Sequence, residues 1–409
     1  MTIMDKTVAI VGTFDTKARE FSFVKEEFEV LGLKTYLIHI GVFESELEVE
    51  VNNKEIARAV NEDIEKIVKD KNRAKATKVL SQGLEKILPK LYQEGKFDGV
   101  IALGGSGGSS IATAGMRQLP IGVPKIMVST MASGNVSQYI GTSDIIMFPS
   151  IVDVEGLNDI SRHIFSNAIH AMVGMLSYDY KAKEDNKPLI AASMFGLTTP
   201  AIKYAEKELE ARGYETIVFH ATGSGGRTME RLISENYFDG VLDLTTTEWC
   251  DEVVGGVLNA GPHRLEAAVS KKVPQVVSLG ALDMVNFGPK ETVPKEFSNR
   301  LFYEHNPTVT LMRVTKEEAK NIAGIIAQKL KNASKETTIL FPKKGFSGLD
   351  EVGKEFYNPE VDQLVMDTIK EELSGTDVTI IEKDLHINDE AFAKSAVDEL
   401  IKNVEKEGK

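Results

Sequence analysis

The sequence predicts an α/β protein made of two doubly wound, Rossmann-like domains, each with a parallel sheet, that are related by internal duplication. Short, continuously apolar segments such as Thr7–Gly12 ("TVAIVG") alternate with helical patterns, which is typical of parallel strands buried on both faces. The same order of segments recurs in both halves. A chain of 409 residues, 42% of them hydrophobic, can bury more than one core.

The internal repeat is visible in the residues themselves. Glu27–His39 ("EFEVLGLKTYLIH") aligns with Glu208–His220 ("ELEARGYETIVFH"), and five positions are identical. "KFDGVIAL" from Lys96 aligns in the same way with "YFDGVLDL" from Tyr237. The offset falls from 181 to 141 residues between the two pairs, so the first half carries about forty extra residues after its second strand.

These extra residues are rich in Glu and Lys. Their apolar residues recur at helical spacing, at Ile56, Val60, Ile64, Ile67 and Val68. We expect one surface helix with a single packed face. A dimerisation arm is the alternative.

The remaining elements follow from the same periodicities. In the first half we expect strands over 7–12, 34–40, 97–103, 123–129 and 144–150, and helices over 17–32, 73–94, 109–117 and 156–178. In the second half we expect strands over 188–193, 215–220, 238–244 and 274–280. A linker over 180–189 then divides the chain into domains 1–182 and 183–409. The tail after Leu301, with a strand and a helix opened by Thr315, is assigned to the second domain.

Charge and cysteine content exclude several classes of protein. A net charge of −13 argues against a general affinity for nucleic acid or anionic membranes. No apolar run is long enough for a membrane span, so we expect a cytoplasmic protein. The single cysteine, Cys250, allows no intramolecular disulfide. It is interpreted as a buried, inert thiol, with a nucleophile as the alternative.

Ligands of open parallel sheets bind beyond the carboxyl ends of the strands, where helix N-termini offer free N–H groups. Small and hydroxyl-bearing residues follow the strands there. In the first half they lie in the loops 12–17 ("GTFDTK"), 104–110 ("GGSGGSS") and 129–135 ("STMASGN"). In the second half they lie in 195–200, 221–227, 245–252 and 280–288.

The glycine-rich loop 104–110 predicts an anion site. Glycines let backbone amides approach an anion closely, although a strand-to-helix turn that needs glycine only for packing would look similar. The loop lacks the Lys of a Walker P-loop and does not complete G-x-G-x-x-G. His39 and His220 stand where an NAD site would place an acid, so NAD is disfavoured.

Charged residues near the same strand ends are candidates for chemistry. Lys17 could neutralise a phosphate, and Asp15 could hold a metal through water, orient a hydroxyl or cap a helix. In the second half, Asp243 interrupts an otherwise apolar strand, which is costly unless the acid is paired. We predict catalytic roles for four residues, with surface capping as the alternative for the last two: Asp243, Glu248, His263 and Arg264.

A resemblance adds to these inferences. The segments "GTFDTK", "GGSGGSS", "STMASGN", "DLTTTE", "AGPHRLEAA", "GALDMVNFGP", "HNPTVTLMR" and "HINDEAFA" occur in this order, and together they resemble the Tm-one-like ATP-binding domain family from near Val8 to near Ala393. The resemblance implies a dimeric cytoplasmic protein with ATP in the first domain, and leaves open whether Mg²⁺ accompanies it. Some family members carry a phosphoenolpyruvate-hydrolase-like module that this sequence lacks, so a separate protein of that kind is an expected partner.

Carried over by position, the resemblance assigns sixteen residues to the nucleotide: Gly12, Thr13, Asp15, Thr16, Lys17, Gly104, Gly105, Ser106, Gly107, Gly108, Ser109, Ser110, Thr130, Ala132, Ser133 and Gly134. The leading hypothesis is an enzyme that uses ATP and holds an unidentified small molecule in the cleft between its domains. The alternatives are a non-catalytic, nucleotide-dependent binding protein and an ATP-independent enzyme that acts on a phosphorylated or carboxylated small molecule.

Overall fold

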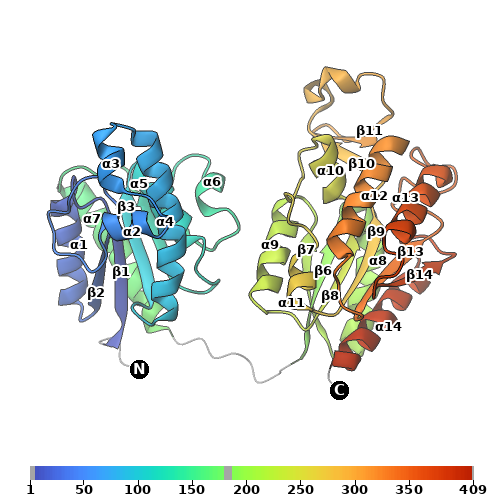
Figure 1. The fold of residues 1–409 in the computed structure, drawn as a ribbon, viewed down its shortest axis with the longest axis horizontal. Coiled ribbons are helices and arrows are strands. Elements are labelled where there is room, and N and C mark those ends of the chain that lie inside the picture. Colours follow the sequence, from blue (N-terminus) through green and yellow to red (C-terminus); the bar gives the residue numbers. More distant parts are fainter. Residues whose placement is uncertain (1–4, 179–186, 408–409) are drawn as a thin grey trace. The chain divides into compact units, whose positions relative to one another are not determined.

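The computed structural model describes residues 5–178 and 187–407 (Figure 1). The chain divides into two compact units, 1–182 (unit 1) and 183–409 (unit 2). Most of the linker predicted over 180–189 lies outside the described residues. Among the helices that are described, none is long and apolar enough to cross a membrane.

Unit 1 is a five-stranded parallel sheet in the order β2-β1-β3-β4-β5, covered by helices on both faces (Figure 1). Its strands are β1 (Thr7–Gly12), β2 (Lys34–His39), β3 (Gly99–Gly104), β4 (Lys125–Ser129) and β5 (Ile146–Pro149). One face carries α1 (Ala18–Val30) and α7 (Asp159–Ser177), and the other carries α4 (Arg73–Gln93) and α5 (Ser106–Met116). A short α6 (Ser137–Ile140) follows β4.

The inserted residues of unit 1 do not form the single helix that their spacing predicted. They form α2 (Asn53–Arg58) and α3 (Ile64–Lys69), separated by a turn in which Asn61 has a φ of 60°. Ile56, Ile64 and Ile67 are nevertheless buried in the same core as α4. The helical spacing of apolar residues is therefore shared by two short helices, and both pack on unit 1 as parts of its core.

Unit 2 extends the same plan. Its six-stranded parallel sheet has the order β14-β13-β9-β8-β6-β7. The strands are β6 (Leu189–Met194), β7 (Glu215–His220), β8 (Gly240–Thr245), β9 (Gln275–Gly280), β13 (Thr337–Pro342) and β14 (Thr379–Lys383). Helices α8 (Thr199–Ala211) and α14 (Glu390–Glu407) pack on one face. The helices packed on the other face are α9 (Ser224–Ser234), α10 (Glu248–Val254), α11 (Ala267–Lys271), α12 (Lys316–Leu330) and α13 (Pro359–Glu372).

A small antiparallel sheet in unit 2 was not predicted. Its order is β10-β12-β11, with β10 (Met284–Phe287), β12 (Val309–Arg313) and β11 (Phe302–Asn306). The predicted loop 280–288 therefore contains a strand. The first two strands of the tail, β11 and β12, belong to this sheet, whereas β13 and β14 extend the main sheet. The short helices η2 (Gly196–Thr198), η3 (Lys290–Thr292) and η4 (Lys295–Phe297) complete the unit.

The duplication predicted from the sequence is visible in the topology. The order β2-β1-β3-β4 of unit 1 matches β7-β6-β8-β9 of unit 2. The His at the end of the second strand stacks on a Phe that follows the first strand in both units. Ring centroids are 5.6 Å apart for Phe14 and His39, and 6.0 Å apart for Phe195 and His220.

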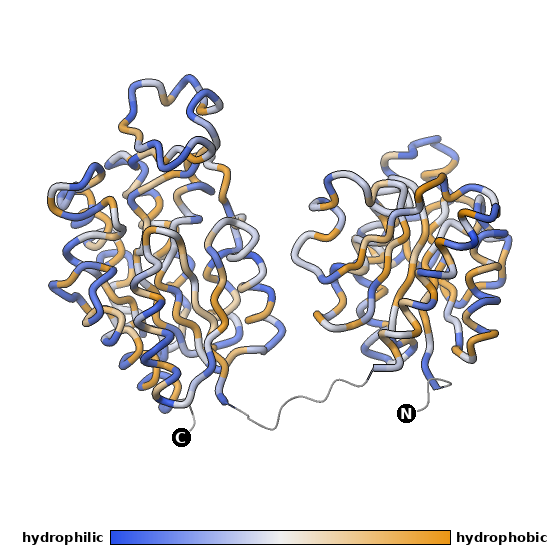
Figure 2. Tube along the Cα trace, turned by 180° about the vertical axis from the view of Figure 1, so that it is seen from behind, coloured by the Kyte–Doolittle hydropathy of each residue, from blue (hydrophilic) through white to orange (hydrophobic). Residues whose placement is uncertain are grey.

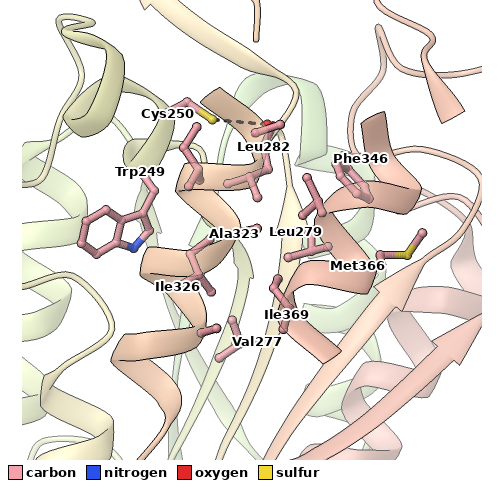
Figure 3. Close-up of a cluster of buried hydrophobic side chains, with 14 of the residues drawn as sticks. Trp249, Cys250, Val277, Leu279, Leu282, Ala323, Ile326, Phe346, Met366 and Ile369 are labelled. Atoms are coloured by element: carbon pink, nitrogen blue, oxygen red, sulfur yellow. Dashed lines mark hydrogen bonds between the residues drawn. The ribbon is translucent and has the colours of Figure 1, made fainter. Parts of the chain in front are cut away.

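Hydrophobic residues concentrate in the strands, and hydrophilic ones mark the outer faces of the helices (Figure 2). Cys250 belongs to the large core beneath α12 and α13, where its Sγ donates to the Leu282 carbonyl oxygen at 3.3 Å (Figure 3). Burial raises the pKa of the Cys250 thiol well above its ordinary value. The interpretation of Cys250 as a buried, inert thiol fits this environment.

Candidate functional site

A cavity of about 710 Å³ opens beside the strand ends of unit 1. The loops after β1 and β2, the inserted segment and the first turns of α4 and α5 surround it. Its lining residues are Thr13, Asp15, Thr16, Ile40, Gly41, Val42, Phe43, Ile67, Val68, Lys71, Asn72, Arg73, Ala76, Thr77, Gly107, Gly108 and Ile111. The cavity combines an apolar wall with backbone amides, hydroxyls and three charged side chains, which is the usual make-up of a small-molecule site.

Asp15 is the one carboxylate among these lining residues. Its Oδ2 accepts a hydrogen bond from the Phe43 amide at 2.9 Å. Its Oδ1 is buried and has no hydrogen-bond partner. A Cβ at position 41 would come within 2.1 Å of this Oδ1, so only glycine lets the loop after β2 lie against Asp15. A buried carboxylate oxygen without a partner is costly, and a ligand donor or ion would satisfy it.

The His39 ring holds the loop after β2 in place through hydrogen bonds. Its Nδ1 accepts from the Phe14 amide at 3.2 Å, and its Nε2 contacts the Phe43 carbonyl oxygen at 2.9 Å. This pattern assigns the proton of the neutral ring to Nε2. Burial lowers the pKa of His39, which favours the neutral form. The Nδ2 of Asn53 donates to the carbonyl oxygens of residues 41, 42 and 43, so α2 holds the loop from its other side.

The glycine-rich loop forms the first turn of α5. The N-cap residue, Gly105, offers no side-chain cap to the first amides of the helix. Gly107 has no atom within 4 Å of the position that a Cβ would take, so its backbone is open to the cavity. Ser109 points away, because its hydroxyl lies 2.6 Å from that of Ser129 in the buried interior. Free N–H groups at a helix N-terminus are suited to an anion.

The inserted segment forms a further wall of the cavity. Ile67 and Val68 of α3 line the cavity, and with Ile40, Val42 and Ile111 they make much of its lining apolar. Lys71 and Arg73 follow at the start of α4. Neither cation has an ion pair within the described part of the chain. No sequence motif marked this wall, although the length of the insertion could have drawn attention to it.

Five of the sixteen residues assigned to the nucleotide line the cavity: Thr13, Asp15, Thr16, Gly107 and Gly108. Gly12 has a packing role, since a Cβ there would lie 2.1 Å from the Phe21 ring. A Cβ at Gly104 would lie 3.2 Å from the Cα of Gly108, which is a tight approach. The others lie outside the cavity lining: Gly105, Ser106, Ser109, Ser110, Lys17, Thr130, Ala132, Ser133 and Gly134.

In unit 2 the structure brings three of the four predicted catalytic residues together. Arg264 donates from Nη1 and Nη2 to Asp243 at 2.5 and 2.8 Å, and from Nε to Glu248 at 2.8 Å. Glu230 accepts from Nη1 at 3.1 Å, and Ser193 donates to Asp243 at 2.6 Å. The Arg264 residue is only 1% exposed. Burial opposes its charge, but attraction to Asp243 and to its other carboxylate neighbours outweighs this and raises the pKa of Arg264.

Glu248 also fills the glycine-rich turn of α9. Its Oε1 accepts from the amides of Gly223 at 2.7 Å and Gly226 at 3.1 Å. This carboxylate therefore occupies the position in which a bound anion would meet the helix N-terminus. His263 lies apart, with its side chain 83% exposed and paired with Glu266 at 2.9 Å. The geometry gives Asp243, Glu248 and Arg264 the properties of a closed ion cluster, which argues against direct contact with a substrate.

Within residues 5–178 and 187–407, no group of three or more His, Cys, Asp or Glu side chains is placed to hold a metal ion. A cation in the cavity of unit 1 would therefore depend on its ligand as well as on Asp15.

Comparison with solved structures gives only weak likenesses. One is a UDP-GlcNAc 2-epimerase of Methanocaldococcus jannaschii, solved with UDP-GlcNAc and UDP, with 12% identity, a TM-score of 0.20 and coverage of 66% of this chain and 83% of that one. Another is UDP-N-acetylglucosamine 2-epimerase from Rickettsia bellii, with 12% identity, a TM-score of 0.21 and 98% of each chain covered. Scores this low carry no argument about function.

Sequence comparison is more decisive. A UPF0261 protein of Clostridium tetani is 50% identical over 98% of this chain and 100% of its own length. A UPF0261 protein of Rhizobium meliloti is 41% identical over 96% of this chain and 98% of its own. The ToMV susceptible protein tm-1(GCR26) of Solanum lycopersicum is 43% identical over 82% of this chain, but the match covers only 45% of that longer protein.

Two family models match along the chain. The N-terminal domain model covers residues 6–181, and the C-terminal domain model covers residues 187–404. The described fold, with a parallel α/β sheet in each unit, is in keeping with these two matches. The chain thus belongs to the uncharacterised protein family UPF0261, as a Tm-1-like member with both of its domains.

Proposed function

We propose that unit 1 binds ATP in the 710 Å³ cavity. The observation that carries the proposal is the opening of the uncapped first turn of α5 into this cavity, next to the partnerless Oδ1 of Asp15. The volume is within the range of about 300–1,000 Å³ that is usual for small-molecule sites. The amides at Gly107 and Gly108 suit a phosphate group, and the hydroxyls of Thr13 and Thr16 lie in the same lining.

The apolar wall supports a nucleotide in particular. Ile67, Val68 and Ile111 in the lining give an apolar surface against which a flat base can be desolvated. Asp15 has one oxygen fixed by the Phe43 amide, so the free Oδ1 can accept from a ribose hydroxyl or hold the water shell of Mg²⁺.

We propose an enzyme that uses ATP on a small molecule, in the cytoplasm and as a homodimer. The alternatives remain a nucleotide-dependent binding protein and an ATP-independent enzyme that acts on a phosphorylated or carboxylated compound. The tomato relatives extend well beyond their match with this chain, so a separate phosphoenolpyruvate-hydrolase-like partner is part of the proposal. The molar mass in solution, measured by light scattering, tests whether the protein is a homodimer.

Isothermal titration with ATP, with and without Mg²⁺, tests the binding. Gly107→Val places a side chain in open space within the site, so we expect it to abolish or greatly weaken ATP binding. Gly174→Val is the matched control, because Gly174 on α7 also has no atom within 4 Å of its Cβ position and does not line the cavity. Wild-type protein that fails to bind ATP under both conditions contradicts the proposal.

A second experiment separates the enzyme from the alternatives. The protein is incubated with ATP and a panel of small carboxylates and phosphosugars, and ADP, AMP or a transferred group is measured. Product formation supports the ATP-using enzyme. ATP binding without product, together with an ATP-dependent change in a captured partner, supports the binding protein. A thermal shift with a phosphosugar but not with ATP supports the ATP-independent enzyme.

A further inference from the structure

The positive charge in the cavity of unit 1 is concentrated on the inserted segment. The lining holds two cations, Lys71 and Arg73, and one carboxylate, Asp15. The whole chain carries a net charge of −13, so a lining with more cations than anions is a local exception. Lys17, which the sequence suggested for phosphate neutralisation, is not part of this lining.

Within the described part of the chain, Lys71 and Arg73 have no acidic partner, in contrast to the nearby Lys54 and Lys75. Lys54 pairs with Glu44 and Glu65 at 3.2 and 2.8 Å, and Lys75 pairs with Glu62 at 3.1 Å. No such pair involves Lys71 or Arg73 among the described residues. Both residues are exposed, so their charge is available to a ligand that enters the cavity.

The position of Arg73 is electrostatically unfavourable in the absence of an anion. It is the first residue of α4, a helix of 21 residues whose first turn contains no acid. A helix N-terminus carries partial positive charge and favours anions, so a cation there adds repulsion. Lys71, just before the Asn72 cap, has a φ of 50°, a backbone conformation that L residues rarely adopt. Two unpaired cations at this helix end form a second anion-attracting edge, separate from the amides of Gly107 and Gly108.

The described residues of unit 2 form no counterpart to this edge. The insertion is confined to the first half of the repeat, and the glycine-rich turn of α9 is filled by the Glu248 carboxylate. A ligand with several negative charges therefore has a place in unit 1 that the duplicated unit does not offer.

We infer that Lys71 and Arg73 bind the phosphate chain of the ligand, so that the cavity selects nucleoside polyphosphates over nucleoside monophosphates. The inference rests on the proposed function and adds ligand selectivity to it. The amides of Gly107 and Gly108 hold one phosphate, and the two cations neutralise charge further along the chain. The apolar wall takes the base, which ATP and AMP share.

The test compares two double variants with the same change in charge. Lys71→Gln/Arg73→Gln removes the cations that line the cavity. Lys66→Gln/Lys78→Gln removes two exposed cations of α3 and α4 that do not line it. Titrations with ATP, AMP and inorganic triphosphate are carried out at low and high salt, and circular dichroism checks that both variants fold.

We expect the first variant to lose tenfold or more in affinity for ATP and triphosphate, because each charge-assisted hydrogen bond to a phosphate contributes strongly to the binding free energy. The loss for AMP should be less than about threefold, because AMP lacks the phosphates that the two cations bind. Its ATP affinity should also depend less on salt. The control should keep wild-type affinities within about twofold. Equal losses for ATP and AMP, or equal losses in both variants, would overturn the inference while leaving ATP binding intact. Wild-type protein that binds none of the three probes contradicts the proposed function itself and removes the inference with it.

Discussion

Arg264 and Asp243 form a two-point ion pair inside unit 2, with Nη1 2.5 Å from Oδ2 and Nη2 2.8 Å from Oδ1. The sequence indicated a site at Asp243 because an acid in an apolar parallel strand needs a partner. The structure supplies that partner from within the chain, and the guanidinium also meets Glu248 and Glu230. The expectation that Asp243 needs a partner is therefore met, and a closed ion cluster provides that partner.

We expect Arg264→Met to destabilise unit 2 strongly, because it leaves three carboxylates without their shared cation. Breaking a buried ion pair on one side costs about 3–5 kcal/mol. His263→Ala, next to it in sequence, removes only an exposed contact and should change the free energy of unfolding by less than about 0.5 kcal/mol. Urea unfolding measures both variants. A loss below about 1 kcal/mol in Arg264→Met would contradict the assignment of the cluster to stability.

Glu248 should behave as an internal substitute for a bound anion. Glu248→Ala removes the acceptor for the Gly223 and Gly226 amides and for Arg264 Nε, and should cost several kcal/mol. Added acetate or formate can enter the vacated space, so thermal unfolding should move back towards the wild-type temperature as its concentration rises.

The control for this rescue is Glu252→Ala on the same helix, since Glu252 has no such role in the cluster. Acetate should shift the melting temperature of this variant no more than that of the wild type. Equal shifts in both variants would show that acetate acts on the protein in general and not at the site of the missing carboxylate.

Most of the fold could be predicted because it rests on local patterns. Apolar runs such as 7–12 and 97–103 predicted the parallel strands, and the repeat predicted the shared strand order. The small sheet was missed because β10 comes directly after a main-sheet strand and turn, and pairs with residues far along the chain. Nothing within 284–287 separates such a strand from a loop.

The candidate site could be predicted only in part, for a similar reason. The strand-end rule pointed to Asp15 and Gly107, and both line the cavity. It gave no information about Lys71 and Arg73, which reach the cavity because α3 ends and α4 begins there. The apolar positions 56, 60, 64, 67 and 68 fit one helix as well as two, and the turn at Asn61, which decides between them, has no strong sequence signal.

Gly12 and Gly107 should respond in opposite ways to substitution by alanine. A Cβ at Gly12 would lie 2.1 Å from Phe21 Cζ, and the Phe21 ring packs edge-on to Phe14 with centroids 4.9 Å apart. Gly12→Ala should therefore destabilise unit 1 by about 1–3 kcal/mol through overpacking. Gly107→Ala has open space in the first turn of α5 and should not destabilise the fold, yet it should weaken ATP binding.

Thermal unfolding and ATP titration of both variants check this contrast. The resemblance placed both glycines at the nucleotide, whereas the structure places only Gly107 in the cavity lining. A Gly12→Ala protein as stable as the wild type would contradict the packing role of Gly12. An unchanged ATP affinity in Gly107→Ala would contradict the role of this turn in binding.

The stability of unit 2 should fall as the pH rises from about 5 to 8. Asp283, Asp350 and Asp362 surround one guanidinium, that of Arg313, which lies 2.9 Å from Asp362 and 3.9 Å from Asp350. Burial, reinforced by the charge of Asp350, raises the pKa of Asp283 to about 7 and that of Asp362 to about 8. The folded cluster therefore holds protons that the unfolded chain releases near pH 4.

Because the folded state binds more protons across this window, the free energy of unfolding decreases with pH by up to roughly 1.4 kcal/mol per pH unit for each proton retained. His39 lies in unit 1 and acts in the opposite direction on the stability of that unit, since its lowered pKa removes stability only as the pH falls below about 6.5. Urea unfolding between pH 7 and 8 thus isolates the carboxylates. Asp283→Asn should flatten the slope, while His39→Gln should leave it unchanged. A wild-type stability that rises from pH 7 to 8 would contradict the retained protons.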